Sequence, residues 1–334
     1  MSFVFELTEN RQSITGKEDR YLTVKGYEGL CKSLDIPKSN AGFDNMELPV
    51  RVIGNHAFSS RKDLEEVTIP DTIHTVLGFA FHNCGKLKKI SLSDSIEEYL
   101  DGGTRQCESL TEIEVTLKRG KPFIIRRILE DNDRRLTFRI HLDDGDALMV
   151  FPGFNYDFVE NTMARTIQFA IEGTGYAYRE CVKSDVIGFR EYDNLFSKVS
   201  ADDKGTAEMI AMARLLMPYE LSDEARNAYE NWLTGHALKS LTKLVKNSNV
   251  KAAESEITFE DYFNNAQEHI AFYLDRKLIN KEDAGKLAHI AADMGITAIV
   301  SMLMDYSGND MDVKNAGDSS VINSSGKDFL ELDF

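Results

Sequence analysis

The sequence predicts an α+β protein in which a short N-terminal β-solenoid precedes an all-α helical domain. Three observations lead to this prediction. Three segments near the N-terminus align without gaps at a period of 23 residues. Helix-start signals follow one another in the second half of the chain. The 334 residues are 42% hydrophobic and 28% charged, which is typical of a folded globular chain and fits about two domains.

The 23-residue repeat is the strongest pattern in the chain. Its copies are AFSSRKDLEEVTI, AFHNCGKLKKISL and GTRQCESLTEIEV, at residues 57–69, 80–92 and 103–115. Each copy has a leucine followed by two apolar residues two positions apart, and such a pair shares one face of a short strand. Because one unit cannot bury its apolar face alone, we expect the units to stack into a solenoid.

The residues that alternate with these apolar positions must point to the outward face of each strand. They are Glu66, Thr68, Lys89, Ser91, Glu112 and Glu114, and we expect them to contact a partner. An Ala–Phe pair before the first two strands supplies a wedge for the interior. The third copy has Gly103 and Thr104 instead, which indicates a terminal unit.

Residues 50–92, VRVIGNHAFSSRKDLEEVTIPDTIHTVLGFAFHNCGKLKKISL, resemble the BspA-like class of bacterial leucine-rich repeats, whose units read roughly I-G-x-x-A-F-x-x-C-x-x-L-x-x-I-x-I-P. The segment YLTVKGYEGLCKSLDIP, residues 21–37, is similar to the usual lead-in. The resemblance covers about a third of the chain. It implies a binding scaffold that recognises other proteins, of a class often displayed on the cell surface.

Three further strands are expected after the repeats, at residues 121–128, 136–142 and 147–153, where they would close the open end of the solenoid. The sequence DDGD at residues 143–146 separates the last two. It has hairpin turn chemistry and lacks the distal Glu of a calcium loop. The first predicted domain is therefore residues 1–153.

A helical domain is expected over residues 154–307. The apolar stretch AEMIAMARLLM at residues 207–217 should be core. Helix starts are predicted at residues 222–224, 258–261 and 280–283, where polar capping residues precede acids. Residues 237–257 and 283–303 share a helix–turn–helix plan that weakly resembles ankyrin-type or other α-solenoid repeats. An antiparallel helical bundle is the alternative.

No catalytic, cofactor or metal motif emerges from the sequence. Gly173–Gly175 lacks the remaining residues of a phosphate loop, and none of the seven histidines has metal-ligand spacing. For residues 176–179 we expect packing between domains, not a ligand-binding surface. For Cys181 we expect a buried structural thiol, not a nucleophile. We therefore expect a non-enzyme without a cofactor. The alternative is an enzyme or nucleotide-dependent regulator with a site around residues 176–179, between the two domains.

The chain is strongly acidic, with 39 Lys and Arg against 55 Asp and Glu and a formal net charge of −16. This charge repels phosphate backbones, so nucleic acid is not expected as a partner. A basic cluster at residues 118–135 runs against it and includes Arg126, Arg127, Arg134 and Arg135. The cluster fits either a docking patch for an acidic partner or salt bridges to the acidic helical half, and we favour the salt bridges.

Residues 308–334 are rich in Gly, Ser, Asn and Asp, which predicts a flexible tail. The tail ends in DFLELDF, so Phe329, Leu330 and Phe334 are candidates for docking on a partner or on the protein's own body. The N-terminal residues lack a secretory-signal pattern, and no apolar stretch is long enough for a bilayer. The sequence therefore predicts a cytoplasmic protein–protein interaction scaffold that does not bind membranes.

Overall fold

The computed structural model describes residues 2–11, 18–43, 46–161, 166–247 and 259–318. The chain divides into two compact units, Met1–Tyr229 and Glu230–Phe334. The division falls within helix α6 (Asp223–Asn247).

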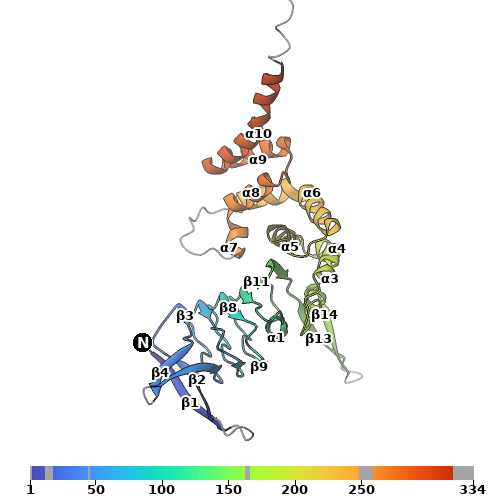
Figure 1. Ribbon diagram of the computed structural model, residues 1–334. Coiled ribbons are helices and arrows are strands. Elements are labelled where there is room, and N and C mark those ends of the chain that lie inside the picture. The colour runs from blue at the N-terminus through green and yellow to red at the C-terminus, as the bar shows by residue number, and fades with distance from the viewer. Residues whose placement is uncertain (1, 12–17, 44–45, 162–165, 248–258, 319–334) are drawn as a thin grey trace, which may run out of the picture. The chain divides into compact units, whose positions relative to one another are not determined.

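The first unit begins with a β-solenoid built from two sheets (Figure 1). One sheet has the order β1-β2-β5-β7-β9, with β4 paired to β5. Its strands are β1 (Ser2–Arg11), β2 (Glu18–Glu28), β4 (Ser39–Phe43), β5 (Met46–Ile53), β7 (Thr75–Val76) and β9 (Glu98–Tyr99). The other sheet has the order β3-β6-β8-β10-β11-β12. Its strands are β3 (Ser33–Asp35), β6 (Glu66–Thr68), β8 (Lys89–Ser93), β10 (Glu112–Thr116), β11 (Leu136–Leu142) and β12 (Gly145–Phe151).

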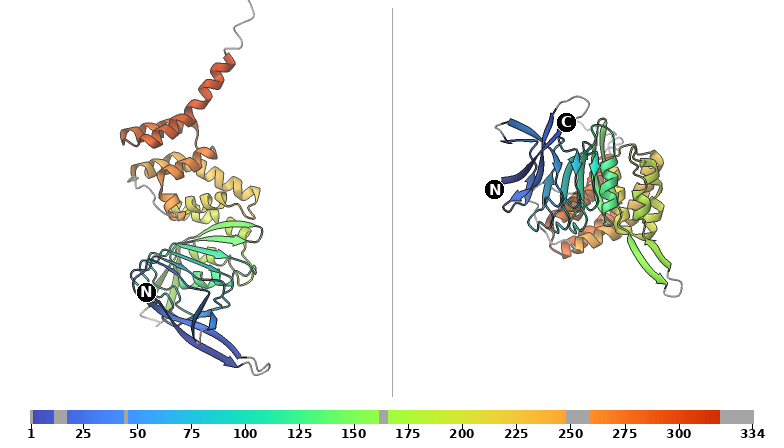
Figure 2. Two further views of the ribbon diagram at one scale, coloured as in Figure 1. Left: turned by 60° about the vertical axis from the view of Figure 1, so that its left-hand side comes forward. Right: turned by 90° about the horizontal axis from the view of Figure 1, so that it is seen from below.

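The predicted repeat strands are confirmed as β6, β8 and β10, which pair in parallel (Figure 2). The repeat leucines Leu64, Leu87 and Leu110 are at most 1% exposed. The wedge rings of Phe58 and Phe81 stack with their centroids 5.2 Å apart. The alternation of apolar and polar residues in the sequence therefore sets which face of each strand is buried.

Each solenoid turn bends through left-handed backbone at positions that also recur every 23 residues. His56, Phe79 and Gly102 have φ of 55°, 57° and 75°. In the last turn a Cβ atom on residue 102 would lie 2.6 Å from the Phe79 ring, so this left-handed position requires glycine.

The strand predicted at residues 121–128 is wrong, because this segment forms helix α1 (Phe123–Asp131). Its buried residues are Ile124, Ile125, Ile128 and Leu129, whose spacing describes one face of a helix. The isoleucines have high strand propensity, and this propensity suggested a strand. Tertiary burial of the helical face overrides it. The other two closing strands are confirmed as the antiparallel hairpin β11–β12, with β11 parallel to β10.

The expectation that the chain turns helical at about residue 154 is also wrong. A two-stranded antiparallel hairpin comes first, formed by β13 (Asn155–Asn161) and β14 (Thr166–Glu172). Helices follow from residue 175: α2 (Gly175–Arg179), α3 (Phe189–Asn194), α4 (Phe196–Asp202) and α5 (Lys204–Leu216).

Helix α5 is the predicted apolar core helix, and it packs against β12. Its Arg214 is 0% exposed and forms hydrogen bonds of 2.8 and 3.0 Å with the two carboxylate oxygens of Asp193. The Tyr229 hydroxyl donates to the same carboxylate at 2.7 Å. A buried charge needs such partners, so this cluster fixes α3, α5 and the start of α6 relative to one another.

The second unit contains the rest of α6 and then α7 (Phe259–Asn264), α8 (Ala266–Asp275), α9 (Lys281–Asp293) and α10 (Thr297–Asp318). The predicted start at residue 280 is confirmed, since the Asn280 side chain accepts from the Asp283 amide. The pair α9–α10 matches the helix–turn–helix expected over 283–303, while the turn of the other pair lies outside the described residues. Ankyrin-like repetition therefore stays a prediction. Helix α10 continues to Asp318, so residues 308–318 are helical where the composition predicted a tail.

Candidate protein-interaction surface

The strand register brings the six predicted outward residues into two rows. Glu66 pairs with Lys89, which pairs with Glu112, and these three side chains form the first row. Thr68, Ser91 and Glu114 form the second row by the same register. Because neighbouring strands lie about 4.8 Å apart, the rows form one continuous polar surface. We call the outward residues of β6, β8 and β10 the polar sheet face.

The polar sheet face is most open at β6 and closes toward β10. Glu66 and Thr68 are exposed, whereas Lys89, Ser91 and Glu114 are half-buried. Glu112 is buried with 3% exposure, so it does not present a free carboxylate to a partner. The six predicted contact residues are therefore adjacent but not equally accessible.

Ion pairs fix the side chains in the half-buried part. The Lys89 ammonium lies 2.8 Å from Glu114 Oε2 and 3.8 Å from Glu112 Oε1. The Ser91 hydroxyl donates to Glu114 at 3.3 Å. Burial raises the pKa of Glu114, but hydrogen bonds from Lys89 and His141 outweigh it and bring the pKa to about 2. Glu114 is therefore a fixed anion at neutral pH.

Sequence reasoning missed His141 as part of this network. Its Nε2 lies 3.0 Å from Glu114 Oε1, and its Nδ1 lies 2.9 Å from Asp146 Oδ1. Burial lowers the pKa of His141, but the hydrogen bonds to the two carboxylates outweigh it, so the pKa is raised. The signal was present in the alternation LTFRIHL, which puts His141 outward, and in the hairpin that places Asp146 opposite it.

On either side of strands β6, β8 and β10, one carboxylate lies between two lysine ammonium groups. Before them, the Glu65 carboxylate lies 3.0 Å from both the Lys32 and the Lys88 ammonium groups. After them, Asp71 bridges Lys38 at 2.8 Å and Lys118 at 2.7 Å, and these hydrogen bonds lower the pKa of Asp71 to about 2. These four lysine side chains are 57–81% exposed, so cations border an acidic centre.

The basic cluster does not form a free patch. Arg126 and Arg127 both pair with Glu130 of their own helix, at 2.9 and 2.6 Å. Arg134 lies 3.8 Å from Glu108 of the last repeat. Burial raises the pKa of Asp203, but bonds from Thr206 and Gly205 and the charge of Arg135 outweigh it, so the pKa is lowered.

The basic cluster therefore does form salt bridges, as predicted, but largely not with the acidic helical half that was predicted as their partner. Most of the ion pairs described above join acids of the repeats and of α1. Arg135 faces the helical half through the charge of Asp203, and the Arg126 guanidinium donates to the Val182 carbonyl there at 3.4 Å.

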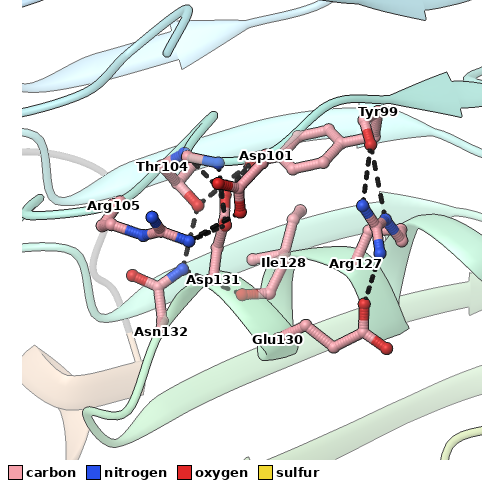
Figure 3. A network of polar contacts seen from close by, with 10 residues as sticks. Tyr99, Asp101, Thr104, Arg105, Arg127, Ile128, Glu130, Asp131 and Asn132 are labelled. Atoms are coloured by element: carbon pink, nitrogen blue, oxygen red, sulfur yellow. Dashed lines mark hydrogen bonds and ion pairs between the residues drawn. The ribbon is translucent and has the colours of Figure 1, made fainter. Parts of the chain in front are cut away.

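Helix α1 closes the solenoid through side chains that replace the next repeat (Figure 3). In earlier turns, the amides of Phe79 and Phe81 donate to the carbonyls of Asp101 and Gly103. The equivalent amides 23 residues on are those of Gly102 and Thr104, and they donate to the Asp131 carboxylate at 3.0 and 3.2 Å. The Arg127 guanidinium donates to the Tyr99 carbonyl at 3.2 Å. Asp131 and Arg127 thus form hydrogen bonds with the main-chain groups that a further solenoid turn would otherwise have paired.

Three depressions lie around Phe154 beside this cap, with volumes of about 700, 410 and 180 Å³. Their lining mixes cations with carboxylates: Arg105, Arg126 and Arg134 with Glu108, Glu130 and Asp133. A nucleotide's phosphates would meet carboxylates here as often as guanidinium groups. This mixture favours contact with a protein surface over a phosphate ligand.

Of the residues 176–179 for which packing was expected, Tyr178 and Arg179 are buried, whereas Tyr176 is 41% exposed. Tyr178 is 0% exposed, and the Arg179 guanidinium donates to the carbonyls of Leu129, Asn132, Arg134, Pro152 and Gly175. Cys181 is buried, and burial raises its pKa to about 11, so its thiol stays protonated.

Across the described ranges, no three His, Cys, Asp or Glu side chains gather to hold a metal ion. No helix in the same ranges is both long enough and apolar enough to cross a membrane. The candidate contacts Phe329, Leu330 and Phe334 lie outside the described residues.

Comparison with known proteins agrees with the repeat geometry. Residues 38–120 match the family model of the BspA type leucine rich repeat region, in 6 copies. No curated protein matches the chain.

Solved structures that are similar to this chain include the following three. A leucine-rich repeat protein from Bacteroides ovatus ATCC 8483 is 25% identical over 34% of this chain and 30% of that one, with a TM-score of 0.27. A leucine rich cell surface protein from Faecalibacterium prausnitzii A2-165 is 23% identical over 36% of each chain, with a TM-score of 0.28. The T. pallidum leucine rich repeat protein is 18% identical over 34% of this chain and 68% of that one, with a TM-score of 0.21. The chain spans about a third of the length of the first two. Residues 38–120 form a leucine-rich repeat region of the BspA type.

Proposed function

We propose that this protein is a non-enzymatic intracellular scaffold that binds another protein through the polar sheet face. The observation that supports the proposal is the strand register, which aligns exposed Glu66 and Thr68 beside the fixed pair Lys89–Glu114. Side chains held by internal ion pairs lose little conformational entropy when a partner binds. The solenoid, residues 1–153, is the binding module in this proposal.

The charge pattern indicates the kind of partner surface. The face itself is acidic, since Glu66 is exposed and Glu114 is a fixed anion. Exposed lysines border it before and after the strands. A protein segment with a basic centre and acidic margins complements this pattern, and such complementarity sets partner choice and association rate.

The intracellular part of the proposal rests on the thiols of the solenoid interior. Cys84 and Cys107 are buried, and their thiols donate to the carbonyls of Phe58 and Phe81 at 3.1 Å. These hydrogen bonds need reduced cysteine, the form that predominates in a reducing compartment. Fractionation of cells that make the full chain tests this location.

The binding proposal is tested by quantitative capture with the full chain and a matched pair of charge reversals. Glu66→Lys changes the exposed start of the polar sheet face. Glu98→Lys makes the same change at an exposed position of β9, in the other sheet. We expect wild type and Glu98→Lys to recover the same partner equally, and Glu66→Lys to recover at least about tenfold less, about 1.4 kcal/mol. Equal recovery by both variants, with unchanged melting temperatures, contradicts the proposal.

A further inference from the structure

Strand β1 forms an open edge of the first sheet. It is ten residues long, and within the described ranges it pairs with β2 alone. An edge strand presents a row of unpaired amide and carbonyl groups, which is a template for another strand. Proteins commonly protect such edges with lysine, proline or a bulge, and β1 contains neither residue.

The bulge in this hairpin lies in β2 and leaves β1 regular. Val4 pairs with Gly26 and Phe5 with Val24, so Lys25 of β2 is the extra residue. The side chains of β1 therefore alternate without interruption. Phe3, Phe5 and Leu7 lie on one face and are half-buried, and the rings of Phe3 and Phe5 stack with centroids 5.9 Å apart.

Both carboxylates of β1 pair with cations of its own hairpin. Glu6 lies 3.1 Å from the Lys25 ammonium, and Glu9 lies 3.1 Å from Arg20 Nε. The chain carries a formal net charge of −16, which would ordinarily keep two copies apart. These ion pairs reduce that repulsion at the edge strand.

We propose that two copies of this chain pair antiparallel through β1, about a twofold axis at Phe5. In this register Phe5 faces the partner's Phe5, and Phe3 faces the partner's Leu7. An axis at Glu6 would oppose two carboxylates, and an axis at Val4 would shorten the ladder. Apolar cross-strand pairs are the unit of sheet stabilisation, and the apolar residues of β1 at positions 3, 5 and 7 lie symmetrically about Phe5, so they match a second copy of the same strand.

Disulfide trapping tests the register directly. Cys31 is half-buried and the other three cysteines are buried, so Cys31→Ser is the background. Across the axis, the two Cα atoms of residue 5 would lie about 5 Å apart, within disulfide range. Those of residue 9 would lie about 27 Å apart, eight residues along the ladder.

We expect Phe5→Cys to form a covalent dimer on mild oxidation and Glu9→Cys to remain monomeric. Equal trapping of both variants, or trapping of neither, overturns the proposal.

Light scattering on the unmodified full chain gives the independent measurement. We expect a mass twice that of the 37.7 kDa chain, and the monomer mass for Phe5→Lys, whose ammonium groups would oppose each other across the axis. A wild-type monomer at the highest soluble concentration overturns the proposal, as does a dimer that Phe5→Lys leaves intact. Disulfide trapping still decides if Phe5→Lys fails to fold. Glu66→Lys should stay dimeric, which separates this inference from the proposed binding function.

Discussion

At the scale of single residues, the end of the solenoid depends on one carboxylate. Asp131 is 5% exposed and accepts from the Gly102 amide, the Thr104 amide and the Tyr99 hydroxyl. Hydrogen bonds to a charged acceptor are roughly twice as strong as neutral ones. The loss of this acceptor would leave buried donors without a partner, which costs more than the bond itself contributes.

Asp131→Ala should therefore lower the free energy of unfolding by about 2–4 kcal/mol, since it orphans several donors at once. Denaturant unfolding of the full chain measures this change. Asp101→Asn is the matched control, because Asp101 is 71% exposed and pairs with Arg105 at the surface. The control should cost less than about 0.5 kcal/mol. An equal effect of the two variants would refute the capping role of Asp131.

His141 gives the polar sheet face a pH dependence whose sign follows from its partners. It faces Glu114 of β10 and Asp146 of β12, and Lys89 of β8 lies beside Glu114. The folded-state pKa of His141 lies above its unfolded value of 6.5. Its contribution to stability is therefore complete below 6.5 and is lost as pH rises through the folded pKa. Glu114 acts oppositely, and its contribution is lost as pH falls from 4.5 toward 2.

His141→Gln should accordingly destabilise the protein more at about pH 5.5 than at about pH 9, by under about 1 kcal/mol because the site is partly exposed. Unfolding curves at the two pH values measure the difference. His82→Gln is the control, since His82 lies against the Phe79 ring. A difference for His141→Gln that does not change with pH would show that the carboxylates do not hold a protonated imidazole.

At the scale of elements, α1 shows where local pattern stops being informative. Isoleucine-rich KPFIIRRI favours a strand by propensity, and a strand would place residues 125 and 128 on opposite faces. A helix places them on one face, and both are 0% exposed. The choice depends on burial against the end of the solenoid, which no local window contains.

Ile125→Ala and Ile128→Ala should each lower the free energy of unfolding by about 2–4 kcal/mol, because both leave a cavity. Arg126→Ala, at a half-buried polar position of the same helix, should cost less than about 1 kcal/mol. Chemical denaturation compares the three. A large loss of unfolding free energy for one isoleucine variant and a negligible loss for the other would instead indicate a strand, in which the two side chains point to opposite faces.

Other elements follow from the sequence to different degrees. Strands β6, β8 and β10 were predictable because three copies repeat one pattern, and β11–β12 because DDGD separates two apolar runs. His141 and Asp146 were accessible to the same reasoning. Asp131 was not, since a polar residue that serves amides 27 and 29 positions away has no periodic signature.

At the scale of the whole molecule, the charged side chains that add up to the net charge of −16 are distributed unevenly over the surface. Acids and bases are paired within the repeats, in α1 and in the hairpin β1–β2, and the polar sheet face alternates cationic borders with an acidic centre. Such a surface encodes partner orientation. Formal charge alone suggested only a low affinity for nucleic acid.

Site-specific photo-crosslinking tests most directly whether the polar sheet face binds a protein. A photoreactive residue replaces Thr68 at the exposed β6 side of the face, or Glu98 in the other sheet, in otherwise unaltered full-length chains. Illumination in cells should yield a discrete adduct with another protein from position 68, and Glu66→Lys should abolish it. Position 98 should yield no such adduct. No adduct from position 68, or the same adduct from both positions, would contradict the assignment of this face as the binding surface.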